Sequence, residues 1–392
     1  MTAKTSRPAR RPRDRKAQIL AAAVECFHRS GYHNTGMDDI ATAVGITAGS
    51  LYWHFRGKQE LLDQVVLTSL DLALSAVREA DGLDAVLRAL TSFSLDNRAF
   101  AALWDREDAN LSADCRAEAR QRQIEVASTV GAAVRDVRPE LDDADAELIA
   151  WAALGVLGSP SYHHVDLPRP HFEDLLCALA SAVCRTPALP PVVTHRPQRP
   201  QPGLTHVSRR EALLAASMRL FTERGFQAVS MDDIGAAAGI SGPAVYNHFK
   251  AKADLLAASL SRASAALFYD LDQALVHSAD SNEALTRTVR TYSGATLAVS
   301  GSTALLANTQ TQLAPADRES LHRSQVEYTA EWAGLLRRCR AELGGAEALV
   351  AVHSVFNLIN FVSRLPLLQR RSDPVQALVD LSTQVLGIRA GH

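Results

Sequence analysis

Apolar residues recur at three- and four-residue spacing near the start of the chain. Within 16–30 the apolar positions are Leu20, Ala23, Val24 and Phe27. This spacing predicts an amphipathic helix, which Gly31 ends because glycine is a common residue just beyond a helix.

Shorter segments follow this first helix. A second helix is predicted over 37–44, and Gly45 permits a tight turn after it. Thr47 is suited to cap a third short helix over 48–54, and Lys58 opens a long fourth helix. The remaining chain is rich in alanine and leucine without any alternating pattern, so the predicted fold is all-α.

The opening pattern occurs twice in the sequence. Residues 14–62 align with 208–256 at a constant shift of 194 without a gap, and 19 of the 49 positions are identical. Two short helices joined by a glycine turn are typical of a helix-turn-helix. A fainter likeness between 146–157 and 346–358 extends the duplication toward the end of each copy.

The stretch 187–206 separates the two copies and contains six prolines. Such a composition predicts an extended spacer of about 3.1 Å per residue. The predicted organisation is a basic flexible tail at 1–13, a helix-turn-helix domain at 14–66, a helical body at 67–186, the linker at 187–206, a second helix-turn-helix domain at 207–260 and a second body at 261–392.

Composition narrows the class of protein. The chain has 392 residues, 47% hydrophobic, with a net charge of −2, and no apolar stretch reaches the length of about 20 needed to span a bilayer. Its five cysteines are an odd number without a C-x-x-C pair. We therefore expect a cytoplasmic protein, not a secreted, membrane or zinc-ribbon protein.

The small net charge conceals an uneven distribution. Residues 1–66 carry ten Lys and Arg against six Asp and Glu, whereas 67–186 carry eleven against twenty. A polyanion such as DNA is therefore expected at the helix-turn-helix ends and not along the acidic body.

The segment MDDIATAVGITAGSLYWHFRGKQELL at 37–62 resembles the DNA-binding domain of the TetR family of bacterial transcriptional regulators, and the second copy is similar. The resemblance covers about 50 residues of each copy and implies two tandem units in one chain. Each unit would have a three-helix DNA-binding domain and a helical body for ligand binding and dimerisation.

The resemblance also implies roles for individual residues in binding double-stranded operator DNA. The expected phosphate contacts are Thr47, Tyr52, His54 and Lys58 in the first copy and Ser241, Tyr246, His248 and Lys252 in the second. The expected base-facing residues are Ala48, Gly49, Ser50 and Trp53 in the first copy and Gly242, Pro243, Ala244 and Asn247 in the second.

Relatives in this family act as dimers through the last two helices of each body. The matching segments here are 144–159, 172–185, 346–364 and 374–388. We expect them to pair within one chain as a pseudo-dimer, with a further homodimer possible. Because the base-facing residues of the two copies differ, we also expect an asymmetric operator.

The resemblance implies a small-molecule effector that binds the body and releases DNA from a repressor. Candidate ligand-binding residues are Phe93, Phe100, Trp104, Trp151, Tyr292 and Trp332. The histidine-rich segment 161–171 lies between prolines and is interpreted as an irregular loop and not a metal site. No metal and no cofactor is expected.

Other functions remain as alternatives. The first unit alone could read DNA while the second serves as a structural partner, since Gly242, Pro243 and Ala244 offer few groups to bases. A helical enzyme is disfavoured because the chain lacks the common linear catalytic motifs. A sequence-indifferent architectural protein would be strongly basic, which this chain is not.

Overall fold

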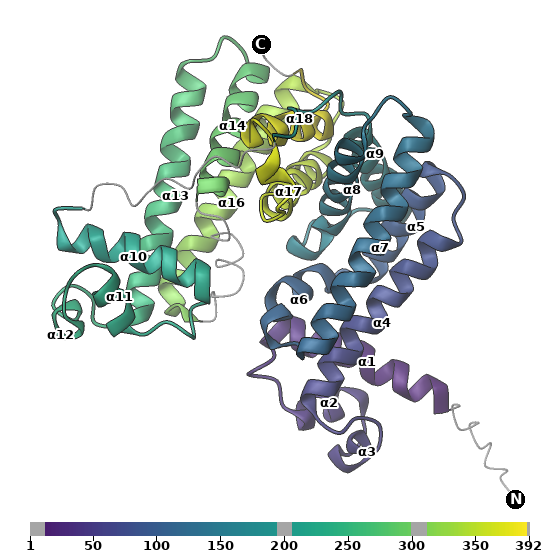
Figure 1. The fold of residues 1–392 in the computed structure, drawn as a ribbon, viewed down its shortest axis with the longest axis horizontal. Helices are drawn as coiled ribbons and strands as arrows, with labels where there is room; N and C mark the ends of the chain where they lie inside the picture. The colour runs from purple at the N-terminus through teal and green to yellow at the C-terminus, as the bar shows by residue number, and fades with distance from the viewer. Residues whose placement is uncertain (1–11, 194–205, 299–311, 390–392) are drawn as a thin grey trace, which may run out of the picture.

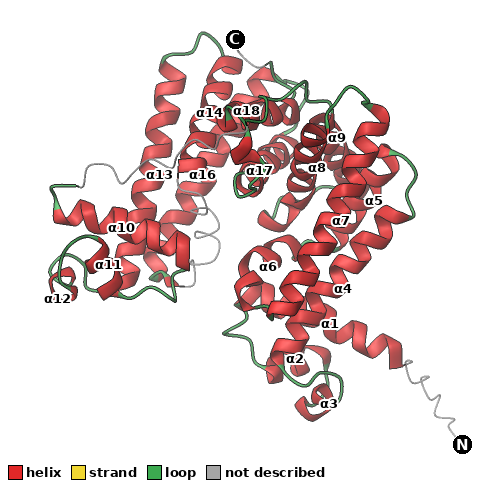
Figure 2. Ribbon diagram, viewed as in Figure 1, coloured by secondary structure: helices red, strands yellow, loops and turns green. Residues whose placement is uncertain are grey.

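The computed structural model describes residues 12–193, 206–298 and 312–389, and within them the regular structure is helical (Figure 2). The one extended pairing in these ranges is an isolated antiparallel bridge between Val192 and Arg371. The predicted all-α fold is confirmed. The expected basic tail falls almost wholly on residues 1–11, outside the described part of the chain.

The two units repeat one order of helices along the chain (Figure 1). The helices of the first unit are α1 (Pro12–Ser30), α2 (Met37–Val44), α3 (Ala48–Tyr52), α4 (Lys58–Arg78), α5 (Leu83–Asp96), α6 (Phe100–Glu107), α7 (Ala113–Val137), α8 (Asp143–Gly158) and α9 (Arg169–Cys184). Those of the second are α10 (Arg209–Arg224), α11 (Met231–Ala237), α12 (Gly242–Val245), α13 (Lys252–Val276), α14 (Ser281–Ala298), α16 (Pro315–Cys339), α17 (Gly345–Val362) and α18 (Pro374–Leu386).

The turn between the second and third helices has the same backbone in both units. Gly45 and Gly239 both adopt φ +72°, a conformation that a side chain disfavours. The Ile46 N–H donates to the Ala41 carbonyl at 2.9 Å, and an equivalent bond closes the second turn. The predicted helix-turn-helix is therefore present twice.

Each three-helix domain has its own apolar core. In the first domain Phe27, Ile40, Leu51 and Phe55 are buried, whereas Ile46 is half buried. These cores fix the first three helices on the long α4 and α13, which lead into the bodies.

The two bodies share one continuous hydrophobic core. Buried residues of α4, α5, α7, α8 and α9 form a single cluster with those of α13, α14, α16, α17 and α18. The predicted segments 144–159, 172–185, 346–364 and 374–388 correspond to α8, α9, α17 and α18 to within three residues. In the structure α8 packs on α17, and α9 packs on both α17 and α18 (Figure 1).

Helix α17 lies in the middle of this core. It is the single helix in the described ranges that is long and apolar enough to cross a membrane. Its neighbours α8, α16 and α18 cover it, and many of its apolar side chains are fully buried. Its hydrophobicity is therefore accounted for by packing against other helices of the same chain.

Two glycines allow α8 and α17 to approach closely. A Cβ atom on Gly155 would lie 3.0 Å from the Leu358 Cα, and one on Gly158 would lie 3.1 Å from Asn357 Nδ2. The Asn357 amide donates to the Gly155 carbonyl at 2.6 Å, and the hydroxyls of Ser159 and Ser354 lie 3.0 Å apart.

A buried ion pair and the start of the linker add to the contact between the units. Arg371 of the second unit is buried and pairs with Asp145 of α8. It also donates to the carbonyls of Ala144, at 2.6 Å, and Pro190, at 3.1 Å. The first part of the expected linker is thus bound to the second unit, while residues 194–205 lie outside the described chain.

Two histidines from different units stack at the same contact. The rings of His163, in the loop before α9, and His353, on α17, have centroids 4.7 Å apart. Burial, with His353, Arg98 and His164 nearby, lowers the pKa of His163 to about 3. Burial lowers the pKa of His353 to about 4.

We expect Gly155→Ala to weaken the contact between the units. Overpacking against a backbone atom costs about 1–3 kcal/mol, and the better helix propensity of alanine returns about 1 kcal/mol. A net loss of about 1 kcal/mol in the free energy of unfolding should appear in urea denaturation. The matched control is Gly334→Ala on the exposed side of α16, where a Cβ meets no atom within 4 Å; it should stabilise the chain instead.

The histidine pair should make the chain less stable in acid. Both groups are neutral in the folded chain at pH 7, whereas in the unfolded chain they take up protons as the pH falls below about 6.5. The unfolded chain is therefore stabilised by protonation while the folded chain is not. The free energy of unfolding should fall between about pH 6 and pH 4, by about 1.4 kcal/mol per pH unit for each histidine. His353→Phe should reduce this slope by one proton in urea denaturation at several pH values. An unchanged slope would contradict the buried neutral pair.

Candidate DNA-binding and ligand-binding sites

Helix α3 and the residues directly after it present a row of exposed side chains. We call this surface, residues 47–54, the first reader, and the matching surface, residues 241–248, the second reader. The Thr47 hydroxyl caps the helix by accepting the Ser50 N–H at 3.2 Å. Tyr52, Trp53 and His54 are all exposed, and Trp53 is 91% exposed. A tryptophan this exposed is unusual in a folded protein, and the expected base-facing position of Trp53 is consistent with it.

Helix α3 ends earlier than predicted. The segment 48–54 was expected to be helical, but α3 stops at Tyr52 and Trp53 is its C-cap. The His54 N–H bonds to the Leu51 carbonyl at 3.0 Å, in the tighter three-residue pattern that often closes a helix. Ala48 is half buried against the domain core, while Gly49 and Ser50 are exposed.

The second reader has the same arrangement of residues, but it offers fewer side chains that can hydrogen-bond to bases. Helix α12 spans only Gly242–Val245, and its N-cap Ser241 makes no side-chain capping bond. Tyr246, Asn247 and His248 are exposed in the same places as their counterparts. Pro243 is exposed within the first turn and Ala244 is half buried, so the exposed Asn247 supplies the amide side chain among the expected base-facing residues of the second copy.

A carboxylate lies directly at the start of α12. A Cβ on Gly242 would meet Asp232 Oδ1 at 1.6 Å, so with a side chain at this position the carboxylate would have to turn away. The first reader has Ala48 at the matching position, which rules out the same arrangement there. A negative charge beside the second reader opposes a phosphate at that place.

The two lysines that open the fourth helices are engaged by the protein itself. Lys58 Nζ donates to the Tyr32 carbonyl at 2.8 Å and lies 4.4 Å from the centre of the Tyr32 ring. Lys252 Nζ donates to the carbonyls of Phe226 and Val229, both at 2.7 Å, and lies 4.4 Å from the Phe226 ring. Burial lowers the pKa of Lys252. Both lysines therefore fasten the turn before the second helix to the fourth helix.

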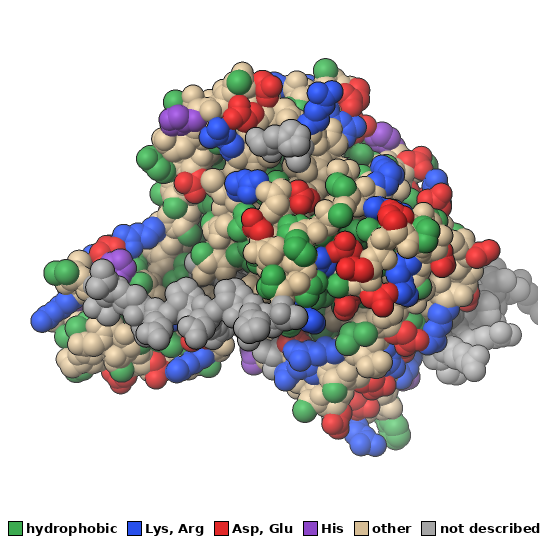
Figure 3. Space-filling model, turned by 45° about the horizontal axis from the view of Figure 1, so that its top comes forward, with side chains coloured by type: hydrophobic (Ala, Val, Ile, Leu, Met, Phe, Trp, Pro, Cys, Tyr) green, Lys and Arg blue, Asp and Glu red, His purple; other side chains and the backbone are tan. Residues whose placement is uncertain are grey.

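Charges of both signs are interspersed on the face of the molecule that is shown in Figure 3. Figure 3 shows Lys and Arg side chains among Asp and Glu side chains over this face of the molecule.

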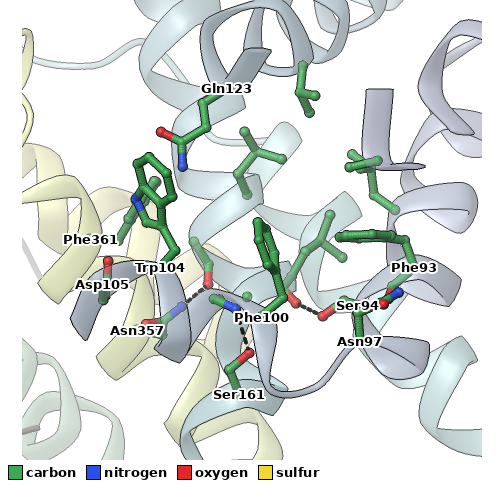
Figure 4. A pocket seen from close by; sticks show the side chains of 18 of the residues that line it. Phe93, Ser94, Asn97, Phe100, Trp104, Asp105, Gln123, Ser161, Asn357 and Phe361 are labelled. Atoms are coloured by element: carbon green, nitrogen blue, oxygen red, sulfur yellow. Dashed lines mark hydrogen bonds between the residues drawn. The ribbon is translucent and has the colours of Figure 1, made fainter. Parts of the chain in front are cut away.

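A cavity of about 130 Å³ lies in the first body (Figure 4). Four of the predicted ligand-binding residues line it, namely Phe93, Phe100, Trp104 and Trp151. The sequence did not predict the polar side chains of the lining or the residues that the second unit contributes to it. The former are Ser94, Asn97, Asp105, Gln123, Ser161 and Tyr162, and the latter are Asn357 and Phe361.

The two candidates in the second body do not line this cavity. Tyr292 and Trp332 are buried, with ring centroids 5.8 Å apart, in a cluster that includes Tyr328 and Phe356. Trp332 is fully buried and Tyr292 donates its hydroxyl to Asn360.

Helix α6 connects the cavity to the first DNA-binding domain. Trp104 and Asp105 face the cavity, and the next two residues contact α1 and the turn after it. Arg106 donates to the Phe27 carbonyl, and the buried Glu107 accepts the Tyr32 N–H at 3.1 Å. A shift of α6 would therefore move the base of the reader.

The histidine-rich loop has a structural role. His163 is buried and stacks on His353, and His171 Nε2 lies 2.7 Å from Glu347 Oε1. Within the described residues no group of three or more His, Cys, Asp or Glu could hold a metal.

Comparison with known proteins finds matches at both DNA-binding domains. The sequence model of the bacterial regulatory proteins of the tetR family matches residues 19–65 and 213–259. The HTH-type transcriptional activator FasR of Mycolicibacterium smegmatis is 46% identical over 72 residues, which are 18% of this chain and 33% of FasR. The HTH-type transcriptional repressor KstR2 of Rhodococcus jostii is 38% identical over 86 residues, which are 21% of this chain and 42% of KstR2.

The chain spans less than half the length of the curated relatives it matches. Among solved structures, a TetR-family transcriptional regulator from Bordetella parapertussis aligns with a TM-score of 0.43 and 19% identity, over 46% of this chain and 95% of that one. The residues on which the predicted resemblance rests fall inside both matched ranges, and the resemblance is confirmed.

The structural role of Lys252 can be separated from the expected phosphate contact. We expect Lys252→Ala to lower the free energy of unfolding by about 1–2 kcal/mol, because two backbone carbonyls lose a charged donor. The control is Lys250→Ala, an exposed neighbour, which should leave stability unchanged. The reverse result, unchanged stability with the salt dependence of log K for DNA reduced by about one unit, would assign Lys252 to phosphate instead.

Proposed function

We propose that this chain, a tandem member of the TetR family of bacterial regulatory proteins, is a ligand-responsive repressor whose two units pair within one chain. The pair would read an asymmetric operator in double-stranded DNA and leave it when a small molecule binds the first body. The named relatives are transcriptional regulators, one an activator and one a repressor.

The continuous core between the bodies is the observation that carries the pairing. The contact buries apolar side chains of α8, α9, α17 and α18 and includes the buried Arg371–Asp145 pair. A core of this kind is typical of permanent association and not of transient contact. Pairing within the chain also leaves both readers at the lower edge of the molecule in Figure 1, α12 on the left and α3 on the right.

An asymmetric operator is supported by the difference between the readers. Trp53 and Asn247 occupy matching positions, and one is an indole while the other is an amide. A symmetric dimer presents two identical helices and requires a palindrome, whereas these two surfaces favour different bases.

Release by a ligand is supported by the path through α6. A molecule in the cavity would contact Trp104 and Asp105, and the same helix holds Phe27 and Tyr32 through Arg106 and Glu107. Because binding can shift an equilibrium only by its differential affinity for two states, the molecule must favour a position of α6 that DNA binding does not allow.

A second candidate is a regulator in which only the first unit reads DNA. The Asp232 carboxylate at Gly242 and the short α12 favour it. In this case the second unit would serve as a folded partner for α8 and α9.

Selection of random DNA by the purified full-length chain tests the proposal. Enrichment of two unlike half-sites would support two working readers, and an inverted repeat of one half-site would support the second candidate. No enriched sequence would overturn both.

The variants Asn247→Ala and Trp53→Ala should each relax base preference at one half-site only, with Asn247→Ala costing about 1–3 kcal/mol at its base. The matched control is Tyr269→Ala, an exposed aromatic on α13 about 25 Å along the helix from its start. Equal losses at both half-sites would contradict the assignment of one reader to each.

A further inference from the structure

We infer that the cation that meets a DNA phosphate beside each reader is Arg56 in the first unit and Lys250 in the second, and not Lys58 or Lys252. This inference rests on the proposed DNA-binding function. It names the side chains through which the chain would hold the sugar-phosphate backbone next to the bases that it reads.

Each reader is followed by two basic residues at the start of the next helix. They are Arg56 and Lys58 in the first unit and Lys250 and Lys252 in the second. Arg56 and Lys250 occupy matching positions, because the two copies align at a constant shift of 194. The positive charge is the same in both copies, whereas the side chain is arginine in one and lysine in the other. A contact that needs a cation of either kind, such as a phosphate contact, fits this pattern.

The donors of Lys252 are already used within the protein. An ammonium group has three N–H donors. The Lys252 Nζ donates to the carbonyls of Phe226 and Val229, both at 2.7 Å, and a third carbonyl, that of Gln227, lies at 3.5 Å. The group also lies 4.4 Å from the centre of the Phe226 ring. A phosphate oxygen would have to displace one of these partners, and the bond that it gains would replace a bond that is lost.

Lys58 is held in a similar way in the first unit. Its Nζ donates to the Tyr32 carbonyl at 2.8 Å and lies 4.4 Å from the centre of the Tyr32 ring. The carbonyl and the ring both attract the positive charge. Lys58 and Lys252 are each half buried. Both lysines are therefore bound to the turn before the second helix of their own domain and are directed away from a ligand.

The side chains of Arg56 and Lys250 are exposed. Among the described residues neither side chain takes part in a hydrogen bond or an ion pair. The backbone beside them is fixed, because the Glu60 carboxylate accepts the Arg56 N–H at 2.7 Å and the Asp254 carboxylate accepts the Ala251 N–H at 3.0 Å. Each unit thus presents one basic side chain without a protein partner from a loop of defined position.

A second exposed cation lies near this place in each unit. Lys16 Nζ lies 5.6 Å from the centre of the Phe55 ring, and the Arg210 guanidinium lies 5.0 Å from the centre of the Phe249 ring. These two phenylalanines directly precede the proposed phosphate-binding residues in the sequence. Positive charges that gather at one place attract an anion more strongly than a single charge does.

The order of the residues places this charge directly beside the reader. His54 and Arg56 are exposed on either side of Phe55, which is buried in the core of the first DNA-binding domain. Phosphate contacts fix the position of a protein on the duplex and carry no direct sequence information. We therefore expect Arg56 and Lys250 to add affinity for every sequence and to leave base preference to the readers.

The first test is the salt dependence of binding to a mixed-sequence duplex by the full-length chain. Arg56→Gln and Lys250→Gln should each weaken binding severalfold and reduce the slope of log K against log salt concentration by about one unit, because each removes one phosphate contact. Arg56→Lys and Lys250→Arg keep the charge and should keep the slope. Lys58→Met and Lys252→Met keep the length of the side chain and should also keep the slope, with folding checked by circular dichroism.

The matched control is Arg337→Gln, which removes the same charge from an exposed residue in the last turn of α16. This residue lies about 33 Å along the helix from its start, whereas Leu321, near that start, packs in the core of the second DNA-binding domain. The slope should stay as in the unmodified chain. An equal reduction by Arg337→Gln would show that the overall charge alone matters and would overturn the inference.

A neutral phosphate analogue locates the contact on the DNA. Methylphosphonate is placed at one position at a time along the operator that the chain selects, and the loss of affinity is measured at each position. One position should matter to the unmodified chain and no longer matter to Arg56→Gln. A position in the other half-site should behave in the same way for Lys250→Gln. If both variants stay sensitive at every position that matters to the unmodified chain, the inference is wrong.

The outcomes separate this inference from the proposed function. A chain that selects an operator but keeps its salt slope in both glutamine variants has the proposed function and loses the inference. A chain that selects no sequence but loses one unit of slope in each variant does the reverse. A slope lost only with Arg56→Gln would overturn the assignment of Lys250, and a slope lost with Lys58→Met or Lys252→Met would return the contact to these lysines. No binding to duplex DNA would overturn both.

Discussion

The close contact of α8 with α17 is the constraint on which the other features depend. It requires Gly155, because any side chain there would meet the backbone at Leu358. Once the helices are this close, the Asn357 amide reaches the Gly155 carbonyl, and Asn357 and Phe361 become part of the cavity wall in the first body. The apolar contact joins the bodies, and the buried Arg371–Asp145 pair fixes their register because an unpaired charge there would be costly.

The helices and the two readers could be predicted from the sequence because their signals are local. The spacing of apolar residues predicts α1, and Gly45 predicts the turn. The same pattern occurs in the second copy, which supports both predictions. The bond from Lys58 to the carbonyl of Tyr32 could not be predicted, since the two residues are 26 positions apart in the sequence. A lysine at a helix start has the same local sequence whether it binds phosphate or a carbonyl.

The ligand site could be predicted only in part, for a similar reason. Aromatic residues at helical spacing occur both in cores and around cavities, and Trp104 lines a cavity whereas Trp332 fills a core. The difference depends on the neighbours from other helices, such as Val126 in one body and Tyr328 in the other. The contribution of Asn357 comes from the other unit and has no signal near the first body in the sequence.

The position shared by Gly155 and Asn357 explains why the two units differ at their contact. When α8 and α17 are aligned on their buried residues, Gly155 and Asn357 occupy the same position. They also contact each other, so in a symmetric dimer this position would meet its own copy. Two first units would place glycine against glycine and lose the hydrogen bond. Two second units would place Asn357 against Asn357 where no glycine leaves room. The best packing at this point is therefore obtained between unlike units, and one chain supplies both at a high effective concentration.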